Sequence, residues 1–255
     1  MSTALRDLDE QRDRWTRHRV GQALALDAGD KFALGGIAQH MDEIDMRFTA
    51  LPSDPEADPV QLDADTQAWL GENRPTPYGG PPPSFTHDRA TSDSLVRYTQ
   101  YREDAGWDRY LALHRHGGVE LGSRGVAYDI RELRVFPLRQ IVGFVWLVTE
   151  LQVKAAERWD VEGPYEFTLA LRATRRATLG SFAEGWAEPD GGLRHIGTSV
   201  DDHVLIRLEV HDDPDPETVA LDIGDRVENT FGTTGRRHIA NRGEYQGQFD
   251  PRFGY

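Results

Sequence analysis

The chain of 255 residues contains no cysteine, and lysine occurs only at positions 31 and 154. The absence of cysteine excludes disulfide bonds, thiolate metal sites and a cysteine nucleophile. Arginine therefore carries almost all of the positive charge, and with abundant Asp and Ala this usage is typical of a GC-rich bacterial genome. The absence of cysteine fits the reducing cytoplasm, and the arginine usage indicates a bacterial source, so we expect a bacterial cytoplasmic protein.

Long apolar runs are absent as well. The apolar run at residues 141–148 is far shorter than the roughly 20 residues that a membrane-spanning helix needs. The N-terminal residues carry charges where a signal peptide has its apolar stretch. We therefore expect neither a membrane span nor an export signal.

The common sequence signatures of catalysis are missing too. The chain has no Walker A loop, no GxGxxG after a strand, no HExxH, no GxSxG and no zinc-type cysteine spacing. These absences exclude particular families rather than enzymes in general, and we expect no cofactor. The net charge of −14 argues against a general affinity for nucleic acid, because phosphate binding requires a basic face.

The chain does contain one long helical pattern, at residues 137–159. Leu138, Ile141 and Val145 recur at helical spacing, and Pro137 suits a first helical turn, where its missing N–H needs no partner. Apolar side chains surround the first half, which indicates a buried helix, whereas polar residues follow Glu150. We expect this helix to form the centre of a small domain.

The residues around this helix predict an α+β domain at residues 95–232. Alternating apolar residues predict strands at residues 109–115, 119–122, 165–171, 178–182 and 203–210. Asp215 followed by Pro216 predicts the start of a last helix, which ends at Gly232. The order of these elements indicates a mostly antiparallel sheet packed on the long helix and the C-terminal helix.

Residues 1–50 predict a small helical hairpin in front of this domain. The second helix carries an apolar seam with alternating spacings of three and four residues: Leu34, Ile37, Met41, Ile44 and Phe48. Two heptads are too few to establish a coiled coil, so this helix packs either on its neighbour or on a protein partner or second copy. A DNA-reading helix-turn-helix is disfavoured by Asp42, Glu43 and Asp45, whose charges would face phosphate.

Two further segments lack periodicity. Residues 51–94 are acidic and then rich in proline, which predicts an extended linker, with a proline-rich ligand for an aromatic groove as the alternative. Residues 233–255 combine glycine and arginine with isolated aromatic residues and predict a flexible tail.

Two groups of arginines are the candidate contacts for an anion or a partner. Arg172, Arg175 and Arg176 crowd a predicted loop between strands, while Arg236 and Arg237 lie in the tail. Together with the aromatic residues of the tail, the second group is of the kind that binds single-stranded nucleic acid. A solvated turn and an unstructured end are the competing interpretations on a chain this acidic.

Histidines and acidic residues suggest two metal sites. His114 and His116 lie on one face of a predicted strand, a spacing that metal sites use, but no third ligand accompanies them. The second set would have to converge in the fold from distant positions: Glu184, Glu188, His195 and His203. Because surface histidines and turn acids explain the same residues, we assign no metal ligand and no catalytic residue.

Residues 179–186, LGSFAEGW, follow the strand at 165–171 and the long helix, and the predicted hairpin contains the run HRHGGVE. These segments resemble the C-terminal region of bacterial proteins that carry an AlbA-like (Schlafen-type) DNA-binding domain. The resemblance covers at most residues 109–225 and implies no catalytic residue. The AlbA-like module itself has no counterpart here, since the helical hairpin and the linker stand in its place.

The sequence therefore favours a non-catalytic interaction or regulatory module of a bacterial cytoplasmic complex. A nucleic-acid-associated accessory protein and a metal-dependent hydrolase are the alternatives. A protein partner or self-association is expected through the second N-terminal helix, and nucleic acid is disfavoured by the net charge.

Overall fold

The computed structural model describes residues 45–233 apart from residues 55–56, 74–84, 86, 91–93, 101–106, 124–125, 131, 183–192 and 212. The chain divides into two compact units, residues 1–43 and residues 44–255. The described residues all belong to the second unit. The first unit, with most of the expected helical hairpin, lies outside the described residues.

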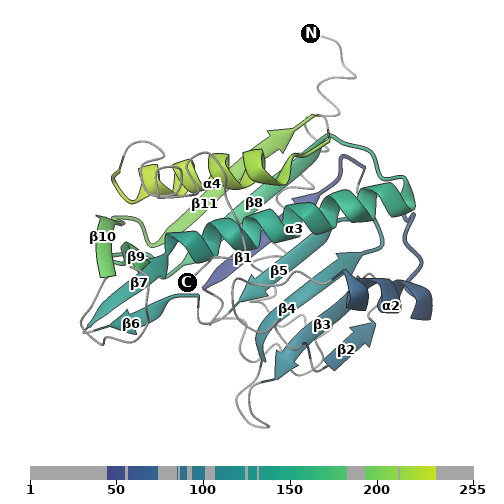
Figure 1. Cartoon of the computed structure of the whole chain (residues 1–255), viewed down its shortest axis with the longest axis horizontal. Helices are drawn as coiled ribbons and strands as arrows, with labels where there is room; N and C mark the ends of the chain where they lie inside the picture. Colours follow the sequence, from purple (N-terminus) through teal and green to yellow (C-terminus); the bar gives the residue numbers. More distant parts are fainter. Residues whose placement is uncertain are drawn as a thin grey trace. The chain divides into compact units, whose positions relative to one another are not determined.

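The second unit is an α+β domain built on a seven-stranded sheet (Figure 1). Every pairing in this sheet is antiparallel, and the strand order is β11-β8-β1-β5-β4-β3-β2. The bounds are β1 Met46–Leu51, β2 His87–Ala90, β3 Ser94–Gln100, β4 Trp107–His114, β5 Val119–Ser123, β8 Tyr165–Arg172 and β11 His203–Val210. The expected fold class, α+β with a mostly antiparallel sheet, is confirmed.

A second, four-stranded sheet has the order β10-β9-β7-β6. Its strands are β6 Tyr128–Ile130, β7 Leu133–Pro137, β9 Thr178–Phe182 and β10 Leu193–Thr198. The pair β7–β9 is parallel, whereas the other two pairs are antiparallel. Asp45 connects the two sheets, because it precedes β1 and its carboxylate pairs with Arg134 of β7.

Three helices accompany the sheets in the described part of the chain. They are α2 Ala64–Glu72, α3 Leu138–Trp159 and α4 Pro216–Thr230. α3 covers the residues expected to form the long helix, and it lies beside α4 on one face of the large sheet (Figure 1). Asp215 caps α4 by accepting a hydrogen bond from the Thr218 N–H at 2.9 Å, as the sequence predicted. No helix in this part of the chain is long and apolar enough to cross a membrane.

The core lies between the large sheet and the two long helices. β8 alternates buried and half-buried residues along its whole length, and Phe167 of this strand stacks on Phe48 of β1 with ring centroids 5.9 Å apart. From α3, Ile141, Val145 and Val148 are fully buried against the same layer. The alternation of β8 was readable in the sequence because a strand exposes its two faces at every second residue.

The helix expected to run through Phe48 is wrong at its end, because residues 46–51 form β1. Residues four apart share a face in a helix and also in a strand, so the spacing of Ile44 and Phe48 fits both structures. Phe48 is fully buried and β1 pairs with β5 on one side and β8 on the other. Phe48, the last member of the apolar seam, is therefore not available for docking a partner.

The linker expected at residues 51–94 is also corrected, since this range contains α2 and β2. Three apolar residues anchor it in the core, namely Val60, Leu70 and Phe85. Asp63, one of the acids that suggested a linker, is the N-cap of α2 and accepts a hydrogen bond from the Thr66 N–H at 2.9 Å. A few well-placed apolar residues are thus enough to fix a segment whose average composition is polar.

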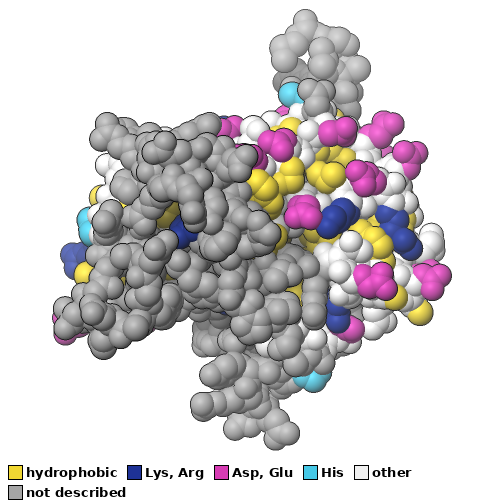
Figure 2. All heavy atoms as spheres, viewed as in Figure 1, with side chains coloured by type: hydrophobic (Ala, Val, Ile, Leu, Met, Phe, Trp, Pro, Cys, Tyr) yellow, Lys and Arg dark blue, Asp and Glu magenta, His cyan; other side chains and the backbone are white. Residues whose placement is uncertain are grey.

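On the face of the molecule seen in Figure 2, Asp and Glu side chains are spread among apolar and basic ones. This surface agrees with the net charge of −14. It shows no continuous basic stripe among the coloured side chains. A basic stripe is the usual electrostatic footprint of a nucleic-acid-binding face.

Replacement of Phe48 by Ala tests the position of β1. The substitution removes a fully buried ring at the centre of the sheet, so we expect the free energy of unfolding to fall by about 3–5 kcal/mol in urea denaturation. Leu133→Ala is the control, because Leu133 is 47% exposed and its loss should cost less than about 0.5 kcal/mol. Equal effects of the two substitutions would contradict the placement of Phe48.

Candidate functional site

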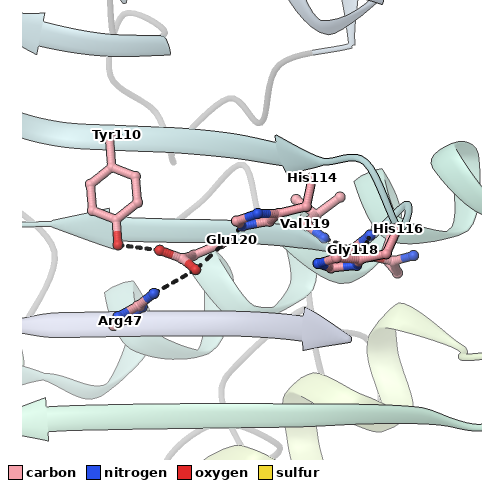
Figure 3. A network of polar contacts seen from close by, with 8 residues as sticks. Arg47, Tyr110, His114, His116, Gly118, Val119 and Glu120 are labelled. Atoms are coloured by element: carbon pink, nitrogen blue, oxygen red, sulfur yellow. Dashed lines mark hydrogen bonds and ion pairs between the residues drawn. The ribbon is translucent and has the colours of Figure 1, made fainter. Parts of the chain in front are cut away.

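A buried polar cluster lies on the face of the large sheet that points away from α3 and α4 (Figure 3). Its members are Arg47 of β1, Glu120 of β5, and Tyr110 and His114 of β4. We call these four residues the Glu120 network. Glu120 is only 4% exposed, and burial of a carboxylate requires charged or hydrogen-bonding partners.

Strand alternation places these side chains on one face. Phe48, Leu121 and Leu111 point into the core beneath the helices. Their neighbours in the chain therefore point to the opposite face. The three strands are adjacent in the order β1-β5-β4, so polar side chains from separate parts of the sequence meet above β5.

Three side chains bind the Glu120 carboxylate. Arg47 Nη2 lies 2.6 Å from Oε2, and the Tyr110 hydroxyl donates a hydrogen bond to Oε1. His114 Nε2 lies 3.5 Å from Oε2. Within the described part of the chain, Nε and Nη1 of Arg47 have no hydrogen-bond partner. The ion pair is therefore made through a single nitrogen of the guanidinium.

A glycine allows Tyr110 to reach the carboxylate. Gly122 stands directly opposite Tyr110 in the β4–β5 ladder, and the tyrosine ring lies flat over it. A Cβ atom at Gly122 would be 2.0 Å from Tyr110 Cε1, a contact that no side chain tolerates. The ring consequently occupies the space of the missing side chain, and its hydroxyl extends along β5 to Glu120.

The charges in the network hold Glu120 ionised. Burial by itself raises the pKa of Glu120, but the positive charge of Arg47 and the nearby His114 imidazole outweigh it, and the pKa lies well below its usual value of 4.5. Burial, with a further contribution from the Glu120 carboxylate, raises the pKa of Tyr110 well above its usual value although Arg47 opposes this shift. At neutral pH the network therefore contains a carboxylate, a guanidinium and a protonated phenol.

The turn between β4 and β5 completes the cluster. His116 stacks on His114 with ring centroids 5.0 Å apart, and its Nδ1 accepts a hydrogen bond from the Gly118 N–H at 3.1 Å. A Cβ atom at Gly118 would meet the His116 ring at 2.6 Å. Gln152 of α3 binds the same turn from the core side, because its amide donates to the Gly117 carbonyl and accepts from the Val119 N–H.

The structure places the predicted arginines separately. Arg172 is half-buried at the end of β8, whereas Arg175 and Arg176 are exposed in the turn that follows. Arg175 lies 3.6 Å from Asp202, and the Arg176 backbone N–H donates to the Ser199 carbonyl. The remaining pair, Arg236 and Arg237, lies outside the described residues, so anion or partner binding by these five arginines stays a prediction.

The residues of the two suggested metal sites are found in different places. His114 and His116 are adjacent as expected, but they stack face to face beside Glu120. In β10, His195 Nε2 is 2.9 Å from Thr198 Oγ1, and His203 begins β11 in the other sheet. The acids of the second set, Glu184 and Glu188, lie outside the described residues. Among the described residues no group of three or more His, Asp or Glu could hold a metal ion.

Sequence reasoning missed Arg47 and Glu120. Glu120 lies between the apolar residues Val119 and Leu121, which is a signal that alternation alone could have revealed. Tyr110 and His114 share a face of β4 opposite Leu111 and were recognisable as neighbours. Arg47 was hidden because the residues around it were expected to form a helix.

No protein-family model matches this chain, and no match is found among curated proteins or solved structures. The resemblance to the C-terminal region of bacterial proteins with an AlbA-like domain therefore stays a prediction.

A single and a double substitution test whether the attraction between Arg47 and Glu120 stabilises the network. Glu120→Leu leaves the Arg47 charge buried without its carboxylate, so we expect a loss of about 3–5 kcal/mol in the free energy of unfolding. The double variant Arg47→Met, Glu120→Leu removes both charges and should be more stable than the single variant. Urea denaturation of the four members of this cycle measures the coupling, and additive losses would refute it.

The pH dependence of stability provides a second test. Glu120 has a lower pKa in the folded chain than its usual 4.5, so its stabilisation is complete above that value and is lost as the pH falls below it. Compared with Glu120→Gln, the wild-type chain should be more stable at neutral pH, and the difference should shrink on acidification. Urea denaturation from about pH 6 to about pH 3 measures this difference. A constant difference would show that Glu120 is not the titrating group.

Proposed function

We propose that this chain is a non-catalytic interaction or regulatory module of a bacterial cytoplasmic complex. The proposal is based on the contacts of the Glu120 network, the buried titratable cluster of the large sheet. Its carboxylate is bound by Arg47, Tyr110 and His114, which are all residues of the same sheet. The cluster therefore stabilises the packing of β1, β5 and β4.

Proton-transfer chemistry fits this network poorly. A general acid or base works best when its pKa lies near the working pH, whereas here the pKa of Glu120 is lowered and that of Tyr110 is raised. Both groups thus keep their protonation state across the neutral range. The flat packing of Tyr110 over Gly122 also fills the sheet surface beside the carboxylate. These features favour a structural role for the charges of the Glu120 network and direct attention to the surface of the domain.

Purification of the full chain from the cells that produce it tests this proposal. We expect the chain to be retained in a complex, either with a protein partner or with itself, in size-exclusion chromatography with light scattering. An inert monomer that retains no partner at any salt concentration would contradict the interaction role.

The two alternative functions give different results with the same protein. A metal-dependent hydrolase would contain a metal ion in elemental analysis and lose it on His203→Ala. A nucleic-acid accessory protein would shift single- or double-stranded DNA or RNA at low salt, and the affinity would fall steeply as salt is added. Either result would replace the present proposal.

A further inference from the structure

β11 forms an outer edge of the large sheet, because β8 is its only partner among the described strands (Figure 1). In β8, the Arg172 N–H donates a hydrogen bond to the Asp45 carbonyl. The backbone N–H and C=O groups of the even-numbered β8 residues therefore point toward β1, and those of the odd-numbered residues point toward β11. Odd-numbered residues of β11 oppose even-numbered residues of β8 and therefore direct their N–H and C=O groups outward. The Arg207 carbonyl agrees, since it accepts a hydrogen bond from Arg226 of α4 at 2.5 Å.

The β11 residues whose backbone groups point outward carry side chains that can complement those of a second copy. Leu205 is 50% exposed, which is unusual for a leucine in the middle of a strand. Arg207 is exposed and has no carboxylate partner among the described residues. Glu209 stands opposite Glu166 of β8, so two like charges face each other across the ladder. His211 lies 3.5 Å from Glu209, and the positive charge of an arginine beside Glu209 would relieve the repulsion between Glu209 and Glu166.

We propose that the edge of β11 pairs antiparallel with β11 of a second copy of this chain. Leu208 then lies opposite Leu208 of the second copy, and Arg207 lies opposite Glu209 of the second copy on both sides of the twofold axis. This inference rests on the interaction role proposed above and names the chain itself as the partner. It moves self-association from the second N-terminal helix to the sheet edge.

Two features favour this register over its neighbours. They are the direction of the backbone groups along β11 and the charges of Arg207 and Glu209. If one copy slips by one residue, residues whose backbone groups point outward lie opposite residues whose backbone groups point toward β8. The backbone hydrogen bonds between the two copies are then lost. A shift by two residues in one direction brings Arg207 against its own copy, and a shift by two in the other direction does the same to Glu209. Like charges directly opposite each other are destabilising. Arg226 is no obstacle, because a carbonyl oxygen has two lone pairs and can accept a second hydrogen bond.

Single cysteines test the register, and the chain has no cysteine of its own to interfere. Leu208→Cys places two thiols opposite each other in a pair that does not share backbone hydrogen bonds, where Cα atoms are about 4.5 Å apart and a disulfide can close. Leu205→Cys is the control, because residue 205 would lie about 20 Å from its copy along the strand. We expect Leu208→Cys to form a disulfide-linked dimer in mild oxidant and Leu205→Cys to remain mostly monomeric, although Leu205 is exposed and Leu208 is half-buried.

Charge exchange tests the Arg207–Glu209 contact in the full chain by sedimentation equilibrium. Arg207→Glu and Glu209→Arg should each weaken dimerisation by at least about tenfold, because each creates like charges in both contacts. The double variant, with Arg207→Glu and Glu209→Arg together, should restore dimerisation. Lys154→Glu on α3 is the control for net charge, since it lies outside the β11 edge and should leave the dimer unchanged.

Several results would overturn the inference. They are a monomer at every concentration, a dimer that is insensitive to charge at β11, and cross-linking at Leu205 in preference to Leu208. If the chain is monomeric but is retained with another protein, self-pairing fails while the interaction role stands. If it is monomeric and retains no partner, both proposals fail.

Discussion

The structure depends on β1 occupying the middle of the large sheet. This strand pairs with β5 and β8, which lie about 70 and 120 residues later in the chain, and no other described strand joins these two. Its two faces serve different purposes. Phe48 packs beneath the helices against Phe167, while Arg47 neutralises Glu120 on the opposite face. Loss of β1 would therefore remove a core ring, the partner of a buried carboxylate and the bridge between the two halves of the sheet.

The Glu120 network shows how the sheet retains a buried charge. Removing a carboxylate from water is unfavourable, and the geometry of the sheet offsets this cost with a guanidinium, a phenol hydroxyl and a nearby imidazole. Tyr110 contributes because Gly122 leaves space for its ring. Gln152 and the stacked histidines extend the same cluster to the turn, so polar contacts hold this turn from both faces of the sheet.

The elements that sequence reasoning identified well have local causes. β8 and β11 alternate strictly, α3 repeats at helical spacing, and α4 begins with a capping Asp and a proline. Each signal depends on neighbours within a few residues. The errors concern β1, α2 and β2, where local signals were ambiguous, and β3, β6, β7 and β10 were not predicted. A spacing of four fits both a helix and a strand, and three buried apolar residues among many polar ones do not change the average composition of a segment.

By itself, the sequence determined the fold class, the long helix, five of the strands after residue 107 (β4, β5, β8, β9 and β11) and the start of the last helix, because periodicity and capping are encoded locally. The tertiary structure alone decided which strands are neighbours. That choice brings Arg47, Tyr110 and His114 to Glu120 and leaves β11 with one edge that no described strand pairs with. Both outcomes follow from pairing between distant segments. The free energy of such pairing depends on burial and charge across the sheet, which no short stretch of sequence contains.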